Sequence, residues 1–388
     1  MPWKDVSLMN QRKELVLLAL QEGTNRRELA RRMGLSPKTL YKWLARYTAQ
    51  GEAGLHDQSR RPHSSPRRTE PDLEQRILSL RDDHPVWGGR KLAKLLQKEH
   101  GLVPSPSTIT AILQRHRRIE TASPQQQGPF IRFEHPEPNQ LWQMDFKGHV
   151  ANVQGRCHPL TVLDDHSRFN LCLAACGDER ASTVQQHLIA VFRRYGLPQR
   201  MTMDNGSPWG AEGSDYTALT VWLMQLGIAV SHSRPYHPQT QGKDERFHRT
   251  LKVELLQWRR FIDNGEAQRE FDRWRLTYNT VRPHEALGMA TPITRYRTSE
   301  IAYPEVLPQP EYLASDKTYK VDKAALITFQ GQRFKIGRAF IGQRIGLRPA
   351  LMDGVWTVWF SRFEIGTIDM RTTGAGMTRS VTHVPEHL

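Results

Sequence analysis

Hydrophobic positions recur every three or four residues through the first third of the chain, which is the spacing of amphipathic helices. Two groups of three helices are predicted, and in each group the third helix starts with Ser-Pro, an N-cap followed by a first-turn proline. The predicted helices cover residues 8–23, 25–34 and 36–51 in the first group and 71–85, 89–101 and 105–119 in the second.

Three short helices with tight connections are typical of a helix-turn-helix unit, whose third helix enters the major groove of DNA. We therefore predict such units at residues 1–56 and 72–119. The alternative is a plain three-helix bundle with a solvated basic face. The residues expected to face DNA are Lys38, Thr39, Tyr41, Lys42 and Arg46 in the first unit, with Leu40, Trp43 and Leu44 packed inward, and Ser107 and Thr108 in the second.

Two segments without periodicity separate these units from each other and from the remainder of the chain. Residues 57–71 are rich in Pro, Ser and Arg, and residues 120–138 form a second linker. The first linker either tracks DNA phosphates or is a solvated tether. Its candidate phosphate contacts are Arg60, Arg61, Arg67 and Arg68.

The pattern changes near residue 140 from helical spacing to short β-rich runs, and then to alternating helices and strands. This order predicts an α/β domain on a mixed five-stranded sheet at residues 139–300. Period-two alternation at residues 318–370 predicts a small β-barrel, and residues 371–388 are expected to be disordered. The α/β domain's strands are expected within 141–150, 158–169, 170–176, 199–206 and 228–233, and its helices within 179–196, 216–227, from 243, and 267–287.

Charge then indicates the partner. The formal net charge is +15 and the isoelectric point is about 9.9, which favours a polyanion such as nucleic acid. Residues 1–135 hold 24 Lys and Arg against 14 Asp and Glu. The start lacks the apolar run of a signal peptide, no stretch is long enough to cross a membrane, and three cysteines without a CxxC pair fit a reducing cytoplasm.

Three acidic residues occupy suggestive places. Asp145 lies inside a predicted strand, Asp204 ends another before Asn-Gly, and Glu245 opens a helix; 58 and 40 residues separate them. Singly, Asp145 could be a salt-bridged strand residue and Asp204 a turn residue. Because all three can meet at one sheet edge, together they favour a metal site. The pair Asp164-Asp165 is as acidic but falls where a hairpin turns, so a turn role is expected.

Helix geometry chooses between Asp244 and Glu245. At about 100° per residue, Asp244 falls on an apolar stripe formed by Phe247, Leu251, Leu255 and Trp258. Glu245 stands away from this stripe and in line with basic residues, so it would hold a metal while they hold DNA. The predicted DNA contacts of this helix are Lys243, Arg246, Arg249 and Lys252.

The stretches WQMDF, LDDHSRF, MDNGSPWG, RPYHPQTQGKDERFHRTLK and YNTVRPHEAL resemble the DDE transposases of bacterial insertion sequences, whose catalytic core is shared with retroviral integrases. The resemblance covers nearly the whole chain. It implies an RNase H-like core in which Asp145, Asp204 and Glu245 are catalytic and bind metal. Two departures stand out: the interval before Glu245 is longer than the family's, with SPWGAEGSDY as the insertion, and no zinc module precedes the core, so zinc is not expected.

This resemblance implies a DNA transposase that binds the ends of a mobile element and catalyses strand cleavage and transfer by two-metal phosphoryl transfer. Its cofactor would be Mg²⁺ or Mn²⁺, two ions per site, and its partners double-stranded DNA (terminal inverted repeats and target) and further copies of itself, as a dimer or larger. It would act at the bacterial nucleoid, in the cytoplasm. The alternatives are an inactive DNA-binding regulator and an RNase H-like nuclease.

Overall fold

The computed structural model describes residues 8–58, 68–101, 103–119, 134–210, 216–232, 242–372 and 376–378. The chain forms two compact units, residues 1–69 and 70–388. Each unit is built around its own cores of buried side chains. In the described parts of the chain no helix is both long and apolar enough to span a membrane.

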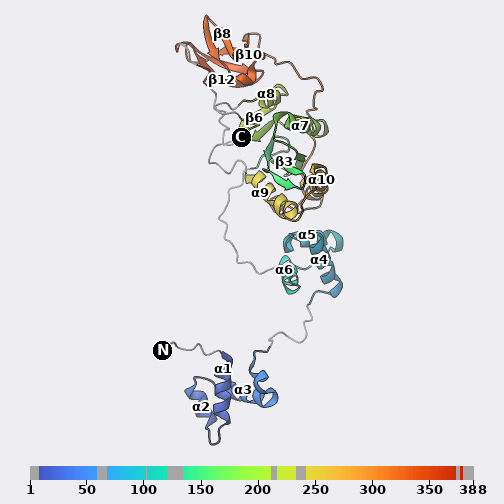
Figure 1. The fold of residues 1–388 in the computed structure, drawn as a ribbon, viewed down its shortest axis with the longest axis vertical. Coiled ribbons are helices and arrows are strands. Elements are labelled where there is room, and N and C mark those ends of the chain that lie inside the picture. The colour runs from blue at the N-terminus through green and yellow to red at the C-terminus, as the bar shows by residue number, and fades with distance from the viewer. Residues whose placement is uncertain are drawn as a thin grey trace. The chain divides into compact units, whose positions relative to one another are not determined.

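The first unit is a bundle of three helices, α1 (Leu8–Leu20), α2 (Arg26–Arg32) and α3 (Pro37–Gln50), closed by a short 3-10 turn (Figure 1). Gly34 makes the turn before α3 with a φ of +64°, and the Ser36 side chain caps α3 by accepting the Thr39 N–H. As predicted, Leu40, Trp43 and Leu44 are buried.

The second unit opens with another three-helix group, α4 (Pro71–Asp83), α5 (Gly89–His100) and α6 (Pro106–Arg115). Ser105 caps α6 as Ser36 caps α3, by accepting the Thr108 N–H at 3.2 Å. Its core joins Ile77, Leu92 and Ile109, one from each helix, around the buried Trp87. Both N-terminal helical groups therefore agree with the sequence prediction.

A mixed sheet forms the centre of the second unit. Its five principal strands lie in the order β4-β3-β1-β5-β6; β1 and β3 are antiparallel, whereas β1, β5 and β6 are parallel. This confirms the predicted mixed five-stranded sheet, to which β2 adds a short sixth strand paired with the start of β3. The strands are β1 (Leu141–Phe146), β2 (Val150–Asn152), β3 (Gly155–Asp164), β4 (Asn170–Cys176), β5 (Arg200–Met203) and β6 (Ala229–His232).

Alternate strand residues enter two different cores, one on each face of the sheet. Trp142 and Met144 pack with α7 (Ala181–Tyr195) and α8 (Ala218–Gln225). Leu163 and Leu173 pack on the other face with α9 (Gly242–Leu251) and α10 (Asn264–Thr280) (Figure 1). Since Met144 faces α7 and α8, its neighbour Asp145 faces α9.

The apolar stripe after Asp244 holds only in part. Phe247, Leu251 and Leu255 are buried as predicted, but Trp258 is 66 % exposed. The reason is a π-helical turn over Lys252–Leu256, whose wider backbone spacing breaks the register of an α-helix.

The C-terminal part is a four-stranded antiparallel sheet, in the order β12-β11-β10-β7, with a separate hairpin of β8 and β9. Among the described residues the four-stranded sheet does not close on itself, so the predicted barrel is wrong: a period-two pattern specifies which face is buried but not whether edge strands meet. The strands are β7 (Lys317–Lys320), β8 (Leu326–Phe329), β9 (Gln332–Lys335), β10 (Arg344–Pro349), β11 (Val355–Phe360) and β12 (Phe363–Asp369).

The predicted disorder of residues 371–388 needs a correction at residues 376–378. Thr378 forms an isolated β-bridge with Thr367 of β12, and Met377 packs against the C-terminal core. Residues 373–375 and 379–388 lie outside the described residues.

Asn279, near the end of α10, holds this helix on the sheet. Its Oδ1 accepts the Asn170 N–H and its Nδ2 donates to the Asn170 carbonyl, both at 2.9 Å. We expect Asn279→Ala to lower the free energy of unfolding by about 2–3 kcal/mol, because buried polar groups lose their partner. Leu276→Ala, on the exposed face of α10, should change it by less than about 0.5 kcal/mol in the same urea titration; equal effects would contradict the account.

Candidate active site

Two of the three predicted metal ligands lie side by side. β1 and β5 run parallel, with Gln143 opposite Thr202, and continuing this register by two residues sets Asp145 opposite Asp204. Met203 packs with α7 and α8, so Asp204, one residue later, shares with Asp145 the face covered by α9. Two carboxylates thus meet at the C-terminal ends of neighbouring parallel strands.

Asp145 is held in an environment that disfavours its charge. Its side chain is 24 % exposed, and its backbone carbonyl accepts the Thr161 hydroxyl at 2.9 Å. Burial raises the pKa of Asp145 to about 7, and the nearby charge of Asp204 contributes to the rise. A cation between the two carboxylates would offset both the cost of burial and the repulsion from Asp204, and would lower the pKa of Asp145.

The loop after Asp204 fixes the position of this residue. Asp204 Oδ1 accepts the Gly206 N–H at 3.0 Å, and the Asp204 carbonyl accepts a hydrogen bond from His232 Nδ1 at 2.8 Å. Further along, Trp209 is buried and stacks on Phe146 with ring centroids 5.6 Å apart. The first half of the predicted insertion is therefore packed onto the end of β1; residues 211–215 are outside the described residues.

On α9 the two neighbouring acids lie on different faces of the helix, as helix geometry predicts. Glu245 is exposed, whereas Asp244 is 1 % exposed and neither carboxylate oxygen has a hydrogen-bond partner among the described residues. Burial raises the pKa of Asp244 well above its ordinary value, and the charges of Asp145 and Asp165 add to the rise. Asp244 is therefore a buried acid whose charged form is strongly disfavoured.

His248 connects α9 to the strands. Its Nε2 lies 2.8 Å from the Thr161 hydroxyl, and its Nδ1 lies 3.9 Å from Asp145 Oδ2. Burial lowers the pKa of His248 to about 3, so the ring is neutral. Because the Thr161 hydroxyl donates to the Asp145 carbonyl, it accepts from His248, which places the proton on Nε2.

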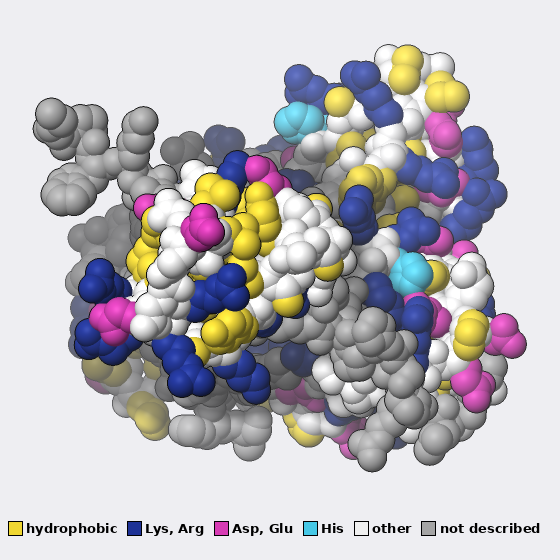
Figure 2. Space-filling model, turned by 90° about the horizontal axis from the view of Figure 1, so that it is seen from below, with side chains coloured by type: hydrophobic (Ala, Val, Ile, Leu, Met, Phe, Trp, Pro, Cys, Tyr) yellow, Lys and Arg dark blue, Asp and Glu magenta, His cyan; other side chains and the backbone are white. Residues whose placement is uncertain are grey.

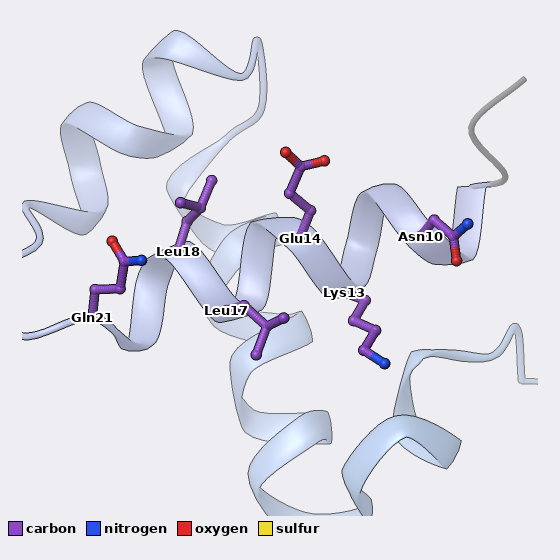
Figure 3. A pocket seen from close by; sticks show the side chains of 6 residues that line it. All are labelled: Asn10, Lys13, Glu14, Leu17, Leu18 and Gln21. Atoms are coloured by element: carbon purple, nitrogen blue, oxygen red, sulfur yellow. The ribbon is translucent and has the colours of Figure 1, made fainter. Parts of the chain in front are cut away.

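The structure gathers the aspartates but not the complete triad. No three His, Cys, Asp or Glu side chains of the described residues are grouped closely enough to hold a metal ion. Glu245 is the fourth residue of α9 and faces outward. Residues 233–241, which come directly before α9, lie outside the described residues. A pocket of about 300 Å³ lies elsewhere, along α1, and is lined by Asn10, Lys13, Glu14, Leu17, Leu18 and Gln21 (Figure 3).

The basic residues of α9 and the turn after it separate into two groups. Arg246, Arg249 and Lys252 are exposed, as a DNA-facing stripe requires. Lys243 is not: its ammonium group forms an ion pair with the buried Asp165, so its predicted DNA contact is replaced by an internal one.

The acidic pair of the hairpin also divides. Asp165 accepts from Gln143 Nε2 at 3.0 Å in addition to pairing with Lys243, so it is more than a turn residue. The predicted turn role holds for Asp164, whose carboxylate accepts from the backbone N–H and the hydroxyl of Ser167.

The predicted DNA-facing residues of α3 and α6 stand on solvent-facing surfaces, with two qualifications. Lys38, Tyr41 and Lys42 are exposed, whereas Thr39 and Arg46 are partly buried. Thr39 bonds the Ser36 cap, and Arg46 stacks over Trp43 at 5.2 Å. Ser107 and Thr108 are exposed and both bind the Ser105 hydroxyl.

Lys and Arg side chains recur over the face shown in Figure 2. Of the predicted linker contacts, Arg68 is exposed. Arg60, Arg61 and Arg67 lie outside the described residues.

Sequence reasoning missed the buried partners in this region: Thr161, His248 and, further along, Glu254. A signal was present for two of them. His248 is four residues after Asp244, and Glu254 is seven after Phe247, so both fall on the inward stripe of α9 where a polar residue needs a partner. Thr161 is opposite Asp145 in the register of β1 and β3, which only the sheet pairing reveals.

Comparison with known families identifies the parts. Integrase core domain models match residues 135–238 and 226–292. A helix-turn-helix domain matches residues 11–63, and a homeodomain-like domain matches residues 39–113. Residues 316–376 match the C-terminal domain of IS481 family transposases.

Individual proteins match this chain only at low sequence identity. An uncharacterized 39.2 kDa protein of insertion element IS476 from Xanthomonas euvesicatoria is 27 % identical over 237 residues, 59 % of this chain and 66 % of that protein, so the match spans just under two thirds of its length. A chain of the simian T-cell lymphotropic virus intasome, in complex with PP2A regulatory subunit B56 gamma, is 18 % identical with a TM-score of 0.37, covering 74 % of this chain and 97 % of that one.

The HTLV-2 integrase catalytic core domain, solved in complex with magnesium, is 16 % identical with a TM-score of 0.33; the match covers 42 % of this chain and 99 % of that one. The integrase core models that match residues 135–238 and 226–292 identify the central sheet and its helices as an integrase core. The chain thus combines an integrase core and helix-turn-helix domains with a segment similar to the C-terminal domain of IS481 family transposases.

The electrostatic coupling of the aspartates can be measured directly. In metal-free protein we expect Asp145 to titrate near pH 7, and Asp204→Asn to lower the pKa of Asp145 by removing one of the charges that raise it. Carboxyl-detected NMR of ¹³C-aspartate-labelled protein measures this, with the exposed Asp272→Asn as a control that leaves the titration unchanged. A pKa near 4 in the wild type would contradict the raised pKa, and an unchanged pKa in Asp204→Asn would show that the pair is not coupled.

Proposed function

We propose that this protein is a DNA transposase that binds the ends of a mobile element and catalyses metal-dependent strand cleavage and strand transfer. The observation that carries the proposal is the pairing of Asp145 and Asp204 on one face of an integrase core, beneath the helix that bears Glu245. A structural role does not explain why two carboxylates lie so close that burial and mutual repulsion raise the pKa of one to about 7.

The donor set fits a hard divalent cation. Carboxylate oxygens are the ligands that Mg²⁺ and Mn²⁺ prefer, and Asp145 and Asp204 would hold such an ion, with Glu245 completing a site for two. The ions would supply positive charge for the attacking and leaving oxygens of an in-line displacement at phosphorus.

The protein's own groups have separate tasks. His248, neutral and bound to Thr161, keeps α9 against β3, the strand paired with the one that carries Asp145, without adding charge. Arg249 and Lys252, exposed on the same helical run as Glu245, would hold the phosphate backbone. α3 and α6 would read the terminal inverted repeats, while target DNA enters at the core.

Because the two ends of an element must be joined together, the acting form would be a homo-oligomer on double-stranded DNA, working at the nucleoid of a bacterial cytoplasm. The second candidate, a regulator with an inactive core, binds the same DNA but leaves it intact.

Glu245→Gln separates these possibilities. The side chain is exposed, so the fold and DNA binding should survive. Strand transfer should fall by at least about 10³-fold, since a neutral amide is a poor ligand for a hard cation. Product formation from labelled end DNA on a denaturing gel is the measurement.

Asp244→Asn is the matched control, because that neighbouring side chain points away from solvent; most activity should remain. If Asp244→Asn lost strand-transfer activity while Glu245→Gln kept it, the metal ligand would be Asp244 and our choice of Glu245 would be wrong. A wild-type protein that binds ends and never cleaves them with Mg²⁺ or Mn²⁺ would favour the regulator.

A further inference from the structure

Glu254, in the π-helical turn after α9, binds donors from two separate parts of the second unit. Its side chain is 9 % exposed. Oε1 accepts from Trp87 Nε1 at 3.2 Å and from Arg282 Nε at 2.8 Å, and Oε2 accepts from Trp274 Nε1 at 3.2 Å. The Lys91 ammonium lies 3.9 Å from Oε1. This cluster is distinct from the aspartate pair, and the proposed chemistry does not use it.

The donors divide cleanly by origin. Trp274 and Arg282 belong to the core, in α10 and just after it, and fix the carboxylate from within. Trp87 and Lys91 belong to the helical group of α4, α5 and α6. Glu254 is therefore a core residue whose remaining hydrogen-bonding capacity is used by the second helix-turn-helix group.

Neighbouring residues hold the Trp87 side chain in the position that this contact requires. Its ring is 2 % exposed and stacks on His84, with centroids 3.8 Å apart and planes 6° apart. Its carbonyl accepts from Arg81 at 2.8 Å. The indole N–H is thus held by rigid neighbours in one direction, and little conformational freedom is lost when it meets the carboxylate.

The strengths of the individual contacts identify Glu254 as the main attachment of the helical group to the core. Arg90 and Arg246 also approach one residue, Glu285, at 3.7 and 3.9 Å, but all three side chains are at least 41 % exposed, and such surface pairs contribute little. The bonds to Glu254 are charge-assisted and shielded from water. Removing a donor there leaves a buried charge less compensated, which is costly.

The position of Glu254 along the chain gives the attachment a consequence. It lies nine residues after Glu245, on the continuous run of α9 and the π-helical turn. The hydrogen bond that holds Glu254 to Trp87 therefore also holds the helix of Glu245 in place relative to α6, the helix expected to contact DNA.

We propose that Glu254 is the anchor by which the second helix-turn-helix group docks on the integrase core, and that this docking presents the DNA held by the group to the Glu245 helix. The docking rests on the contacts alone; its role in presenting DNA rests on the proposed function.

Trp87→Phe and Trp274→Phe form a matched pair of variants. Each removes one indole donor from Glu254 and shortens a buried ring, but only Trp87 belongs to the helical group. In the full-length protein without DNA or metal, Trp87→Phe should raise the hydrogen–deuterium exchange rates of residues 84–95 and 252–258 about tenfold. Trp274→Phe should change exchange in residues 84–95 by less than about twofold.

The functional arm uses labelled duplex carrying the element end, with Mg²⁺. Trp87→Phe should bind this duplex within about twofold of wild type, while its cleavage rate at saturating DNA falls on the order of tenfold. Equal exchange in residues 84–95 for the two variants would overturn the docking. Lost docking with an unchanged cleavage rate would overturn the presenting role.

A wild-type protein that cleaves no end DNA would overturn the proposed function and the presenting role together. The exchange experiment, which involves neither DNA nor metal, would still decide whether Glu254 docks the helical group.

Discussion

The central constraint on this molecule is the placement of two like charges on adjacent strand ends. Parallel pairing of β1 and β5 forces Asp145 and Asp204 onto one face of the sheet, and their partial burial weakens the screening of their charges by water. Left alone, this arrangement is unfavourable and drives one carboxylate toward its protonated form. The divalent cation that we propose at this edge would offset the repulsion between the two carboxylates.

The surrounding structure maintains that arrangement without neutralising it. Lys243, on the helix that covers the aspartates, is paired with Asp165. His248 contacts β3, the strand paired with that of Asp145, as a neutral ring, and Asp244 is buried without a hydrogen-bond partner among the described residues. α9 therefore brings its inward polar groups to the aspartates in uncharged form, while its outward face carries Glu245 and exposed arginines.

Sequence alone predicted what periodicity and local capping determine. The helices of both N-terminal groups, the Ser36 and Ser105 caps and the different faces of α9 that carry Asp244 and Glu245 all result from spacing along one element. The predictions that failed depend on contacts between distant segments or on a local break in helical spacing. Closure of the C-terminal sheet depends on which strand edges meet. The exposure of Trp258 depends on a π-helical turn. The inward position of Lys243 depends on its pairing with Asp165, which is 78 residues away in the sequence. The anchor at Glu254 joins residues 167 positions apart, and no local pattern specifies such a pair.

The central claim is that Asp145 and Asp204 form a cation site, and anomalous diffraction from crystals grown with Mn²⁺ and an element-end duplex tests it most directly. The account predicts an anomalous peak within about 2.0–2.4 Å of carboxylate oxygens from both aspartates, with Glu245 turned toward a second peak. Manganese bound at Asp244 and Asp165, or no peak at Asp145 at millimolar Mn²⁺, would contradict it.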